Sequence, residues 1–124
     1  MHTIPSIFVH RPVLPDSAPV NSGTNKETRR AFAKALRRAR RSRGLTQEDF
    51  SIVSSRTYLS TLERGQKSPT LDKINVISQT IGIHFLSLLA LAYLYSEKSN
   101  DVDSLLARIK LEVASIHRDE ATQS

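Results

Sequence analysis

The side chains with the clearest binding chemistry lie between residues 45 and 65. Ser55 can cap a short helix in this stretch, and the spacing places Leu59 and Leu62 on its inner side. The outer side then carries side chains that can form hydrogen bonds: Arg56, Thr57, Ser60 and Thr61. Thr46 can cap another short helix just before it. Two short helices joined by a tight turn are the arrangement that a DNA-reading helix-turn-helix requires.

No catalytic or metal-binding arrangement is visible in the rest of the sequence. There is no cysteine, which excludes disulfides and thiolate metal sites. The histidines are scattered, with no pair at ligand spacing: His2, His10, His84 and His117. His84 lies inside an apolar run, which is more typical of a helix start or an interface than of a catalyst. The sequence therefore predicts no enzyme activity, no metal site and no cofactor.

The positive charge is concentrated in the middle of the chain. The formal net charge is +6, and residues 24–82 hold 13 basic and 5 acidic side chains, whereas residues 83–124 hold 4 basic and 6 acidic ones. A polyanion such as double-stranded DNA binds largely through such charge, by releasing counterions. A merely solvated basic surface is the alternative, and the adjoining motif favours DNA.

A long basic helix is expected before the motif. Thr24 and Glu27 have the spacing of a capping box, and Gly44 is a typical end. One apolar face is formed by Phe32, Ala35, Leu36 and Ala39. In isolation such a helix could bind RNA or lie on a membrane surface. Directly before the motif, we interpret it as a supporting helix with a phosphate-facing flank.

Two helices are expected after the motif. Thr70 can cap the first, and Gly82 can end it. Its apolar positions are Leu71, Ile74, Ile77 and Ile81. Residues 83–95 are apolar almost all round but too few to span a bilayer. A helix that is apolar on every side is buried on every side, so we expect one side on the core and the other in a self-association surface.

A terminal helix is expected to begin after Asp101, which can cap it. Its narrow apolar stripe consists of Val102, Leu105, Leu106, Ile109, Val113 and Ile116, with Leu111 on the opposite side. The stripe can pack on the body or on a second subunit, and both alternatives stay open. About two heptads are too few for a convincing independent coiled coil.

The N-terminal residues 1–23 hold four of the five prolines and no sustained periodicity, which predicts an extended or disordered arm. The alternative is that its apolar side chains dock on the body or on a partner. Prolines break every apolar run and no basic region leads it, so the arm is not expected to be a signal peptide. We predict three parts: the arm at 1–23, a DNA-binding domain at 24–96, and a C-terminal helix at 97–124 that is a candidate dimerisation element.

Residues 45–65, LTQEDFSIVSSRTYLSTLERG, closely resemble the motif of the Cro/cI-like (XRE) family of bacterial and phage regulators. The resemblance covers about residues 27–93. It implies an all-α, five-helix lambda-repressor-like DNA-binding domain, here with an additional C-terminal helix and a Pro-rich N-terminal arm. Family members usually bind palindromic operators as dimers.

The resemblance also implies roles for individual residues. Gln47 matches a glutamine that anchors a DNA phosphate at a helix N-terminus, where the helix dipole favours an anion. Arg40 and Glu63 match a pair that fixes the recognition helix against the first helix. Lys67 and Ser68 match positions that grip the DNA backbone.

On the predicted recognition helix, Arg56 can donate two hydrogen bonds to a guanine, and a phosphate contact is the alternative. Tyr58 is expected to pack its ring at the domain edge and to send its hydroxyl to a phosphate. The predicted base-reading residues are Arg56, Thr57, Ser60 and Thr61. The predicted phosphate-binding residues are Gln47, Ser55, Tyr58, Lys67, Ser68 and Arg43.

One departure from the family pattern concerns length. Between Leu45 and Gly65 the family usually has two more residues, including a glycine in the turn, whereas residues 52–55 bridge the gap here. We therefore expect a shorter second helix or a tighter turn, and a changed angle between the two helices.

These features predict a sequence-specific regulator of transcription that binds double-stranded DNA, most simply a repressor acting as a homodimer in a bacterial cytoplasm. The alternative is an antitoxin-type regulator, whose N-terminal stretch and terminal helix bind a toxin protein while the motif regulates its own operon. No membrane partner is expected.

Overall fold

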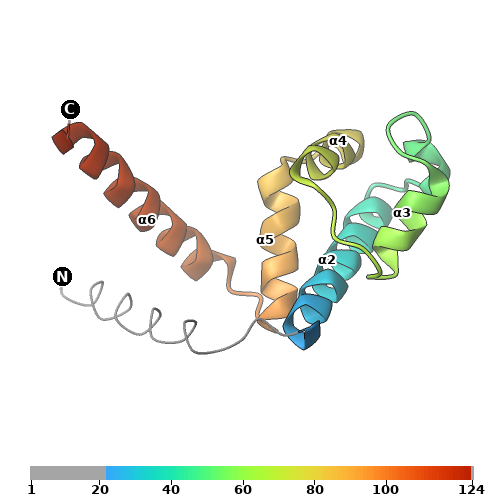
Figure 1. The fold of residues 1–124 in the computed structure, drawn as a ribbon, viewed down its shortest axis with the longest axis horizontal. Helices are drawn as coiled ribbons and strands as arrows, with labels where there is room; N and C mark the ends of the chain where they lie inside the picture. Colours follow the sequence, from blue (N-terminus) through green and yellow to red (C-terminus); the bar gives the residue numbers. More distant parts are fainter. Residues whose placement is uncertain (1–21, 124) are drawn as a thin grey trace.

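The computed structural model describes residues 22–123, in which helices are joined by turns and short loops. The predicted disordered arm falls almost entirely outside these residues. Within them there are five α-helices, one short 3₁₀ helix and no strand, which confirms the predicted all-α class. The elements are α2 (Ser22–Ser42), η2 (Gln47–Phe50), α3 (Arg56–Glu63), α4 (Leu71–Ile81), α5 (Phe85–Ser96) and α6 (Val102–Gln123) (Figure 1).

Helices α2 to α5 and η2 form a body around one apolar core. The predicted inner face of α2 is confirmed, because none of its members is more than 9% exposed: Phe32, Ala35, Leu36 and Ala39. Phe50 of η2, Leu59 and Leu62 of α3, and Leu88 of α5 are fully buried in the same cluster. Each such side chain contributes about 1.5–3 kcal/mol by leaving water, so burial holds α3 firmly on the body.

The ends of the shorter helices follow local side-chain chemistry, as predicted. The Ser55 hydroxyl accepts a hydrogen bond from the backbone amide three residues on at 3.0 Å, which caps α3. Thr70 caps α4 in the same way at 3.2 Å. Gly82 ends α4 with φ at 93°, a left-handed conformation that residues with a side chain rarely adopt.

Two details of the predicted helices were wrong. The first helix begins at Ser22, so Thr24 lies inside its first turn and not at its cap. Helix ends fray, and sequence alone leaves their position uncertain by one or two residues. Leu71 is 71% exposed and does not belong to the buried face of α4. It is the first residue of that helix and follows an exposed loop, so no preceding turn covers it.

The apolar helix α5 is buried on one side only within this chain. Leu88 and Ala92 face the core, whereas Leu86 is 57% exposed and Tyr93 is 43% exposed. The predicted burial is therefore confirmed for the core side alone. No single helix among the described residues is long and apolar enough to cross a membrane; α4 and α5 pass that test together but are bent by 103° at their junction.

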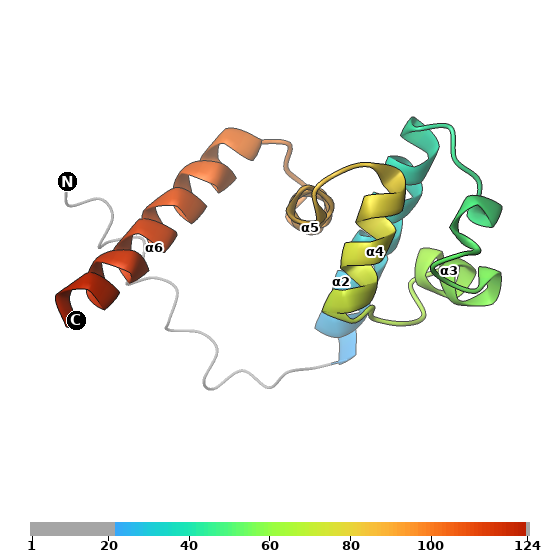
Figure 2. The same cartoon turned by 90° about the horizontal axis from the view of Figure 1, so that it is seen from above.

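The terminal helix α6 extends away from the body in both views (Figures 1 and 2). Asp101 caps it as predicted, because its Oδ1 accepts a hydrogen bond from the Ser104 amide at 3.0 Å. None of the side chains at 102–120 is buried. The apolar stripe therefore does not pack along the body in the single chain. The other alternative, packing on a second subunit, stays a prediction.

Acid should loosen the start of α6. Hydrogen bonds from the Ser104 hydroxyl and amide lower the pKa of Asp101 below its ordinary value. The ionised cap therefore stabilises the helix above the ordinary aspartate pKa, and this contribution is lost as the pH falls through the lowered value. NMR titration of the Ser104 amide should show this loss, whereas Asp101→Asn, which caps without a charge, should remove the transition. A Ser104 amide transition above the ordinary aspartate pKa would contradict this account.

Candidate nucleic-acid interface

The second helix of the motif is reduced to a single 3₁₀ turn. η2 ends at Phe50, and residues 51–54 form turns that lead to the cap of α3. The Asp49 carboxylate accepts hydrogen bonds from the amide and the hydroxyl of Thr46, at 2.7 and 3.1 Å, and this holds the start of η2. The predicted shortening of this helix is confirmed. Of the two predicted motif helices only α3 is an α-helix, and a single 3₁₀ turn takes the place of the other.

The outward side of α3 carries the four predicted base-reading residues, which differ in exposure and in their hydrogen bonds within the helix. Arg56 and Thr57 are exposed, whereas Ser60 and Thr61 are half-buried. The Thr61 hydroxyl donates to the Thr57 carbonyl at 2.7 Å, and the Ser60 hydroxyl accepts a hydrogen bond from Arg64. Because short hydroxyls that bond within their own helix have less capacity for a ligand, Arg56 and Thr57 are the most available of the four.

An ion pair holds Arg56 in the absence of a ligand. Its Nη1 lies 3.3 Å from Oε1 of Glu48 on η2, and both side chains are about 70% exposed. Such an exposed pair contributes only about 0–1 kcal/mol, so exchanging Glu48 for another acceptor costs little. The pair keeps the guanidinium at the start of α3 without locking it there.

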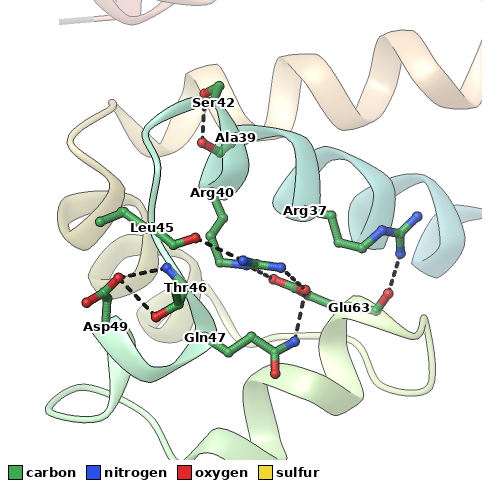
Figure 3. A network of polar contacts seen from close by, with 9 residues as sticks. All are labelled: Arg37, Ala39, Arg40, Ser42, Leu45, Thr46, Gln47, Asp49 and Glu63. Atoms are coloured by element: carbon green, nitrogen blue, oxygen red, sulfur yellow. Dashed lines mark hydrogen bonds and ion pairs between the residues drawn. The ribbon is translucent and has the colours of Figure 1, made fainter.

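A buried ion pair braces α3 against α2. Arg40 donates to both carboxylate oxygens of Glu63, at 2.6 and 2.8 Å, and to the Leu45 carbonyl at 2.9 Å (Figure 3). Arg40 is 7% exposed and Glu63 is 4% exposed. The hydrogen bond to Glu63 raises the pKa of Arg40 above its ordinary value, so the guanidinium stays charged. The predicted contact between these two residues is confirmed.

Gln47 belongs to the same network. Its Nε2 donates to Glu63 Oε1 at 3.0 Å, and the side chain is half-buried (Figure 3). Its role as a phosphate anchor stays a prediction, and only one amide hydrogen remains for it. A single 3₁₀ turn also has fewer aligned peptide dipoles than an α-helix, so less of the helix-end charge reaches a phosphate there.

Two more arginines of α2 bind the C-terminal end of α3. Arg37 donates to the Glu63 carbonyl, and Arg29 Nε donates to the Gly65 carbonyl at 3.3 Å. The last carbonyls of a helix lack partners within it and attract cations. The sequence did not reveal these contacts, because spacing along α2 does not show which neighbour a side chain meets. The phosphate-facing flank of α2 stays a prediction.

Tyr58 and two lysines form a cluster that the sequence did not reveal. The Nζ of Lys73 lies 5.4 Å from the ring centroid of Tyr58, and that of Lys67 lies 5.8 Å away. Lys73 also donates to the Val53 carbonyl at 3.2 Å, which ties α4 to the turn before α3. Burial raises the pKa of the Tyr58 hydroxyl, which therefore keeps its proton at neutral pH and can donate to an anion. Lys73 was missed because its only sequence signal is its place in the first turn of α4.

The remaining predicted phosphate-binding residues lie at element ends. Lys67 and Ser68 are exposed in the loop after α3, and Arg43 is exposed in the turn after α2. Ser55 uses an oxygen lone pair for its cap and keeps its hydroxyl proton available.

Residues 36–88, which contain η2, α3, α4 and the Arg40–Glu63 pair, match the helix-turn-helix family model. An uncharacterised HTH-type transcriptional regulator, y4dJ, from Sinorhizobium fredii is similar to the chain. It is 36% identical over 64 residues, which are 50% of this chain and 83% of that protein. The chain belongs to the Cro/cI-like (XRE) family. No solved structure matches it.

The protein is thus a DNA-binding helix-turn-helix regulator of transcription of the XRE type. The family match covers η2, α3 and α4 entirely and α2 and α5 in part, and leaves out α6. Within the XRE pattern this chain differs by its single-turn η2 and keeps the bidentate brace from Arg40 to Glu63. The family does not supply an explanation for α6.

Proposed function

We propose that this regulator is a sequence-specific repressor that binds a palindromic operator as a homodimer, with α3 as its recognition helix. The observation that carries the proposal is the two-sided character of α3. Leu59, Leu62 and Glu63 are buried and held by α2, while Arg56 and Thr57 are exposed at the start of the helix. The N-terminal turn of a recognition helix is the part that contacts base edges in the major groove.

In this proposal the side chains divide into two roles. The base edges are read by Arg56, Thr57, Ser60 and Thr61. The phosphates are bound by Gln47, Ser55, Tyr58, Lys67, Ser68 and Arg43, with Lys73 added from the structure. The body at residues 24–96 binds DNA, and the C-terminal helix at residues 97–124 contributes to the dimer interface. Repression needs only occupancy of the operator, so this architecture is sufficient for it.

The test compares Arg56 with Lys67, which carry the same charge and differ in role. Arg56→Ala should cost about 1–3 kcal/mol on the cognate site and relax the preference at one base pair in each half-site. Lys67→Ala should weaken binding to all sequences alike and make the salt slope shallower by about one unit per subunit. Both variants are measured against an operator library with randomised positions.

Each outcome of this comparison has a definite meaning. Arg56→Ala with unchanged base preferences and only lower affinity would make Arg56 a phosphate contact and remove the proposed reader. Wild-type protein that shows no base preference in the same library would contradict sequence-specific recognition altogether.

A second candidate function is supported by the apolar side chains on α6. An antitoxin-type regulator binds a protein partner in addition to DNA, and the segment at 83–124 carries two more acidic than basic side chains, which suits a basic partner. Stoichiometric copurification with a small basic protein from the native host, lost when α6 is made polar, would favour this function.

A further inference from the structure

One face of α6 has the pattern of a helix–helix seam. Its members follow one another at alternating spacings of four and three residues, and all are between 41% and 62% exposed: Val102, Leu106, Ile109, Val113 and Ile116. We call these residues the α6 seam. That alternation is the heptad spacing of residues that pack between helices. An apolar stripe exposed along a whole helix marks an interaction surface.

Within the single chain the α6 seam stays exposed to solvent. The helix stands away from the body in both views, and an isolated helix without a packed face is marginal in water (Figures 1 and 2). Its contact with the body is limited to its N-terminal end, where it borders α5. There a groove of about 440 Å³ is lined by Leu86, Ala90, Leu91 and Leu94 of α5 and by Val102 and Leu106 of the α6 seam.

The charges on α6 argue against DNA or an anionic lipid surface as the occupant. Residues 101–120 carry five acidic and three basic side chains, so the segment repels a polyanion. The basic side chains that suit DNA lie on the body instead, around α2 and α3. The occupant of the α6 seam must therefore be apolar and tolerate an acidic rim.

The side chains of the α6 seam favour an assembly of more than two helices. In heptad terms Leu106 and Val113 take the a positions, and Val102, Ile109 and Ile116 take the d positions. β-branched residues at d disfavour a two-stranded coil and shift the preference to three or four helices. Two copies of this chain, each supplying α5 and α6, provide four helices around one core.

We infer that the α6 seam and the groove beside it are the self-association surface, on which a second copy of this chain docks its own α5 and α6. The inference rests on the proposed homodimer and specifies its interface. Leu86, which is 57% exposed and lines the groove, then becomes buried by the partner. The groove shares Val102 and Leu106 with the α6 seam, so it adds apolar surface of α5 to the two heptads of α6.

A matched pair of variants tests the interface. Ile109 lies in the middle of the α6 seam at 42% exposed, and Leu111 lies on the opposite side of the same helix at 45% exposed. Ile109→Glu should raise the dimer dissociation constant at least about thirtyfold, as expected for a buried interface residue. Leu111→Glu introduces the same charge at the same exposure and should leave the constant unchanged. Sedimentation equilibrium of the full chain measures both.

Leu86→Glu adds a test of the groove and should dissociate the dimer as Ile109→Glu does. All three positions are exposed in the single chain and lie outside its core, so the body should keep its wild-type helices in far-UV circular dichroism and any loss of helix should be confined to α6. Ile109→Glu should also keep wild-type affinity for a single half-site at low salt.

The failures can be told apart. A wild-type dimer that is unaffected by Ile109→Glu and Leu86→Glu would overturn this interface and leave the homodimer standing. Equal dissociation by Leu111→Glu would overturn the assignment of the face. A wild-type chain that is monomeric both free and on DNA would overturn the proposed homodimer and this inference with it.

Discussion

Replacing Arg40 with alanine is expected to lower the free energy of unfolding by about 3–5 kcal/mol, because Glu63 would remain buried without its cation. Glu63 is 4% exposed, and its other side-chain partner, Gln47, is neutral. DNA affinity should fall together with stability, since the same pair fixes α3 against α2. Thermal unfolding and operator titration of the variant measure the two effects.

Two further variants control this result. Arg38→Ala removes an exposed arginine from the same helix and should leave the melting temperature unchanged. Replacing the pair together, with Arg40→Met and Glu63→Leu, should recover much of the stability because neither charge is then left buried alone. An Arg40→Ala variant that loses affinity at an unchanged melting temperature would show instead that Arg40 contacts a DNA phosphate directly.

Binding to duplex DNA should weaken on the order of a thousandfold between 50 and 200 mM salt, as expected for about six phosphate contacts in a dimer. The number counts the three cations per subunit that we propose as backbone contacts: Arg43, Lys67 and Lys73. Arg29, Arg37 and Arg40 already donate hydrogen bonds to residues 63–65 and are left out of this count. Fluorescence anisotropy over a salt series gives the slope directly.

The slope also discriminates between structural alternatives. A slope about twice as steep would mean that further cations of the body, such as the exposed Arg38 and Arg41 of α2, contact phosphates as well. Salt-independent binding, or no binding at low salt, would contradict the regulator that we propose.

Elements governed by local chemistry were predictable from the sequence. Ser55, Thr70 and Asp101 cap their helices because a short polar side chain can reach an amide three residues on, which depends on nothing distant. The apolar periodicity of α2 and the inward placement of Leu59 and Leu62 were equally readable. The contact between Arg40 and Glu63 came from the family resemblance alone.

Features that depend on tertiary placement were not predictable. Nothing in the periodicity of α2 indicates that Arg29 and Arg37 cap the end of α3, because both residues look like solvated cations in sequence. Lys73 reaches the Tyr58 ring because the start of α4 lies beside the turn at residues 51–54, where Lys73 also donates to the Val53 carbonyl. The choice between α-helix and 3₁₀ turn at residues 47–50 was equally open, since four residues carry almost no periodicity.

The division of α3 into a buried and an exposed side bears on how such a regulator can diverge. Leu59, Leu62 and Glu63 carry the stability of the helix, whereas Arg56 and Thr57 contribute little to it. Substitutions at exposed positions of this kind usually change the free energy of unfolding by no more than about 0.5 kcal/mol. If the exposed side reads the operator as proposed, a duplicated gene can acquire a new target by changing one or two codons while every intermediate remains folded. Selection on specificity and selection on folding then act on separate positions of the same eight-residue helix.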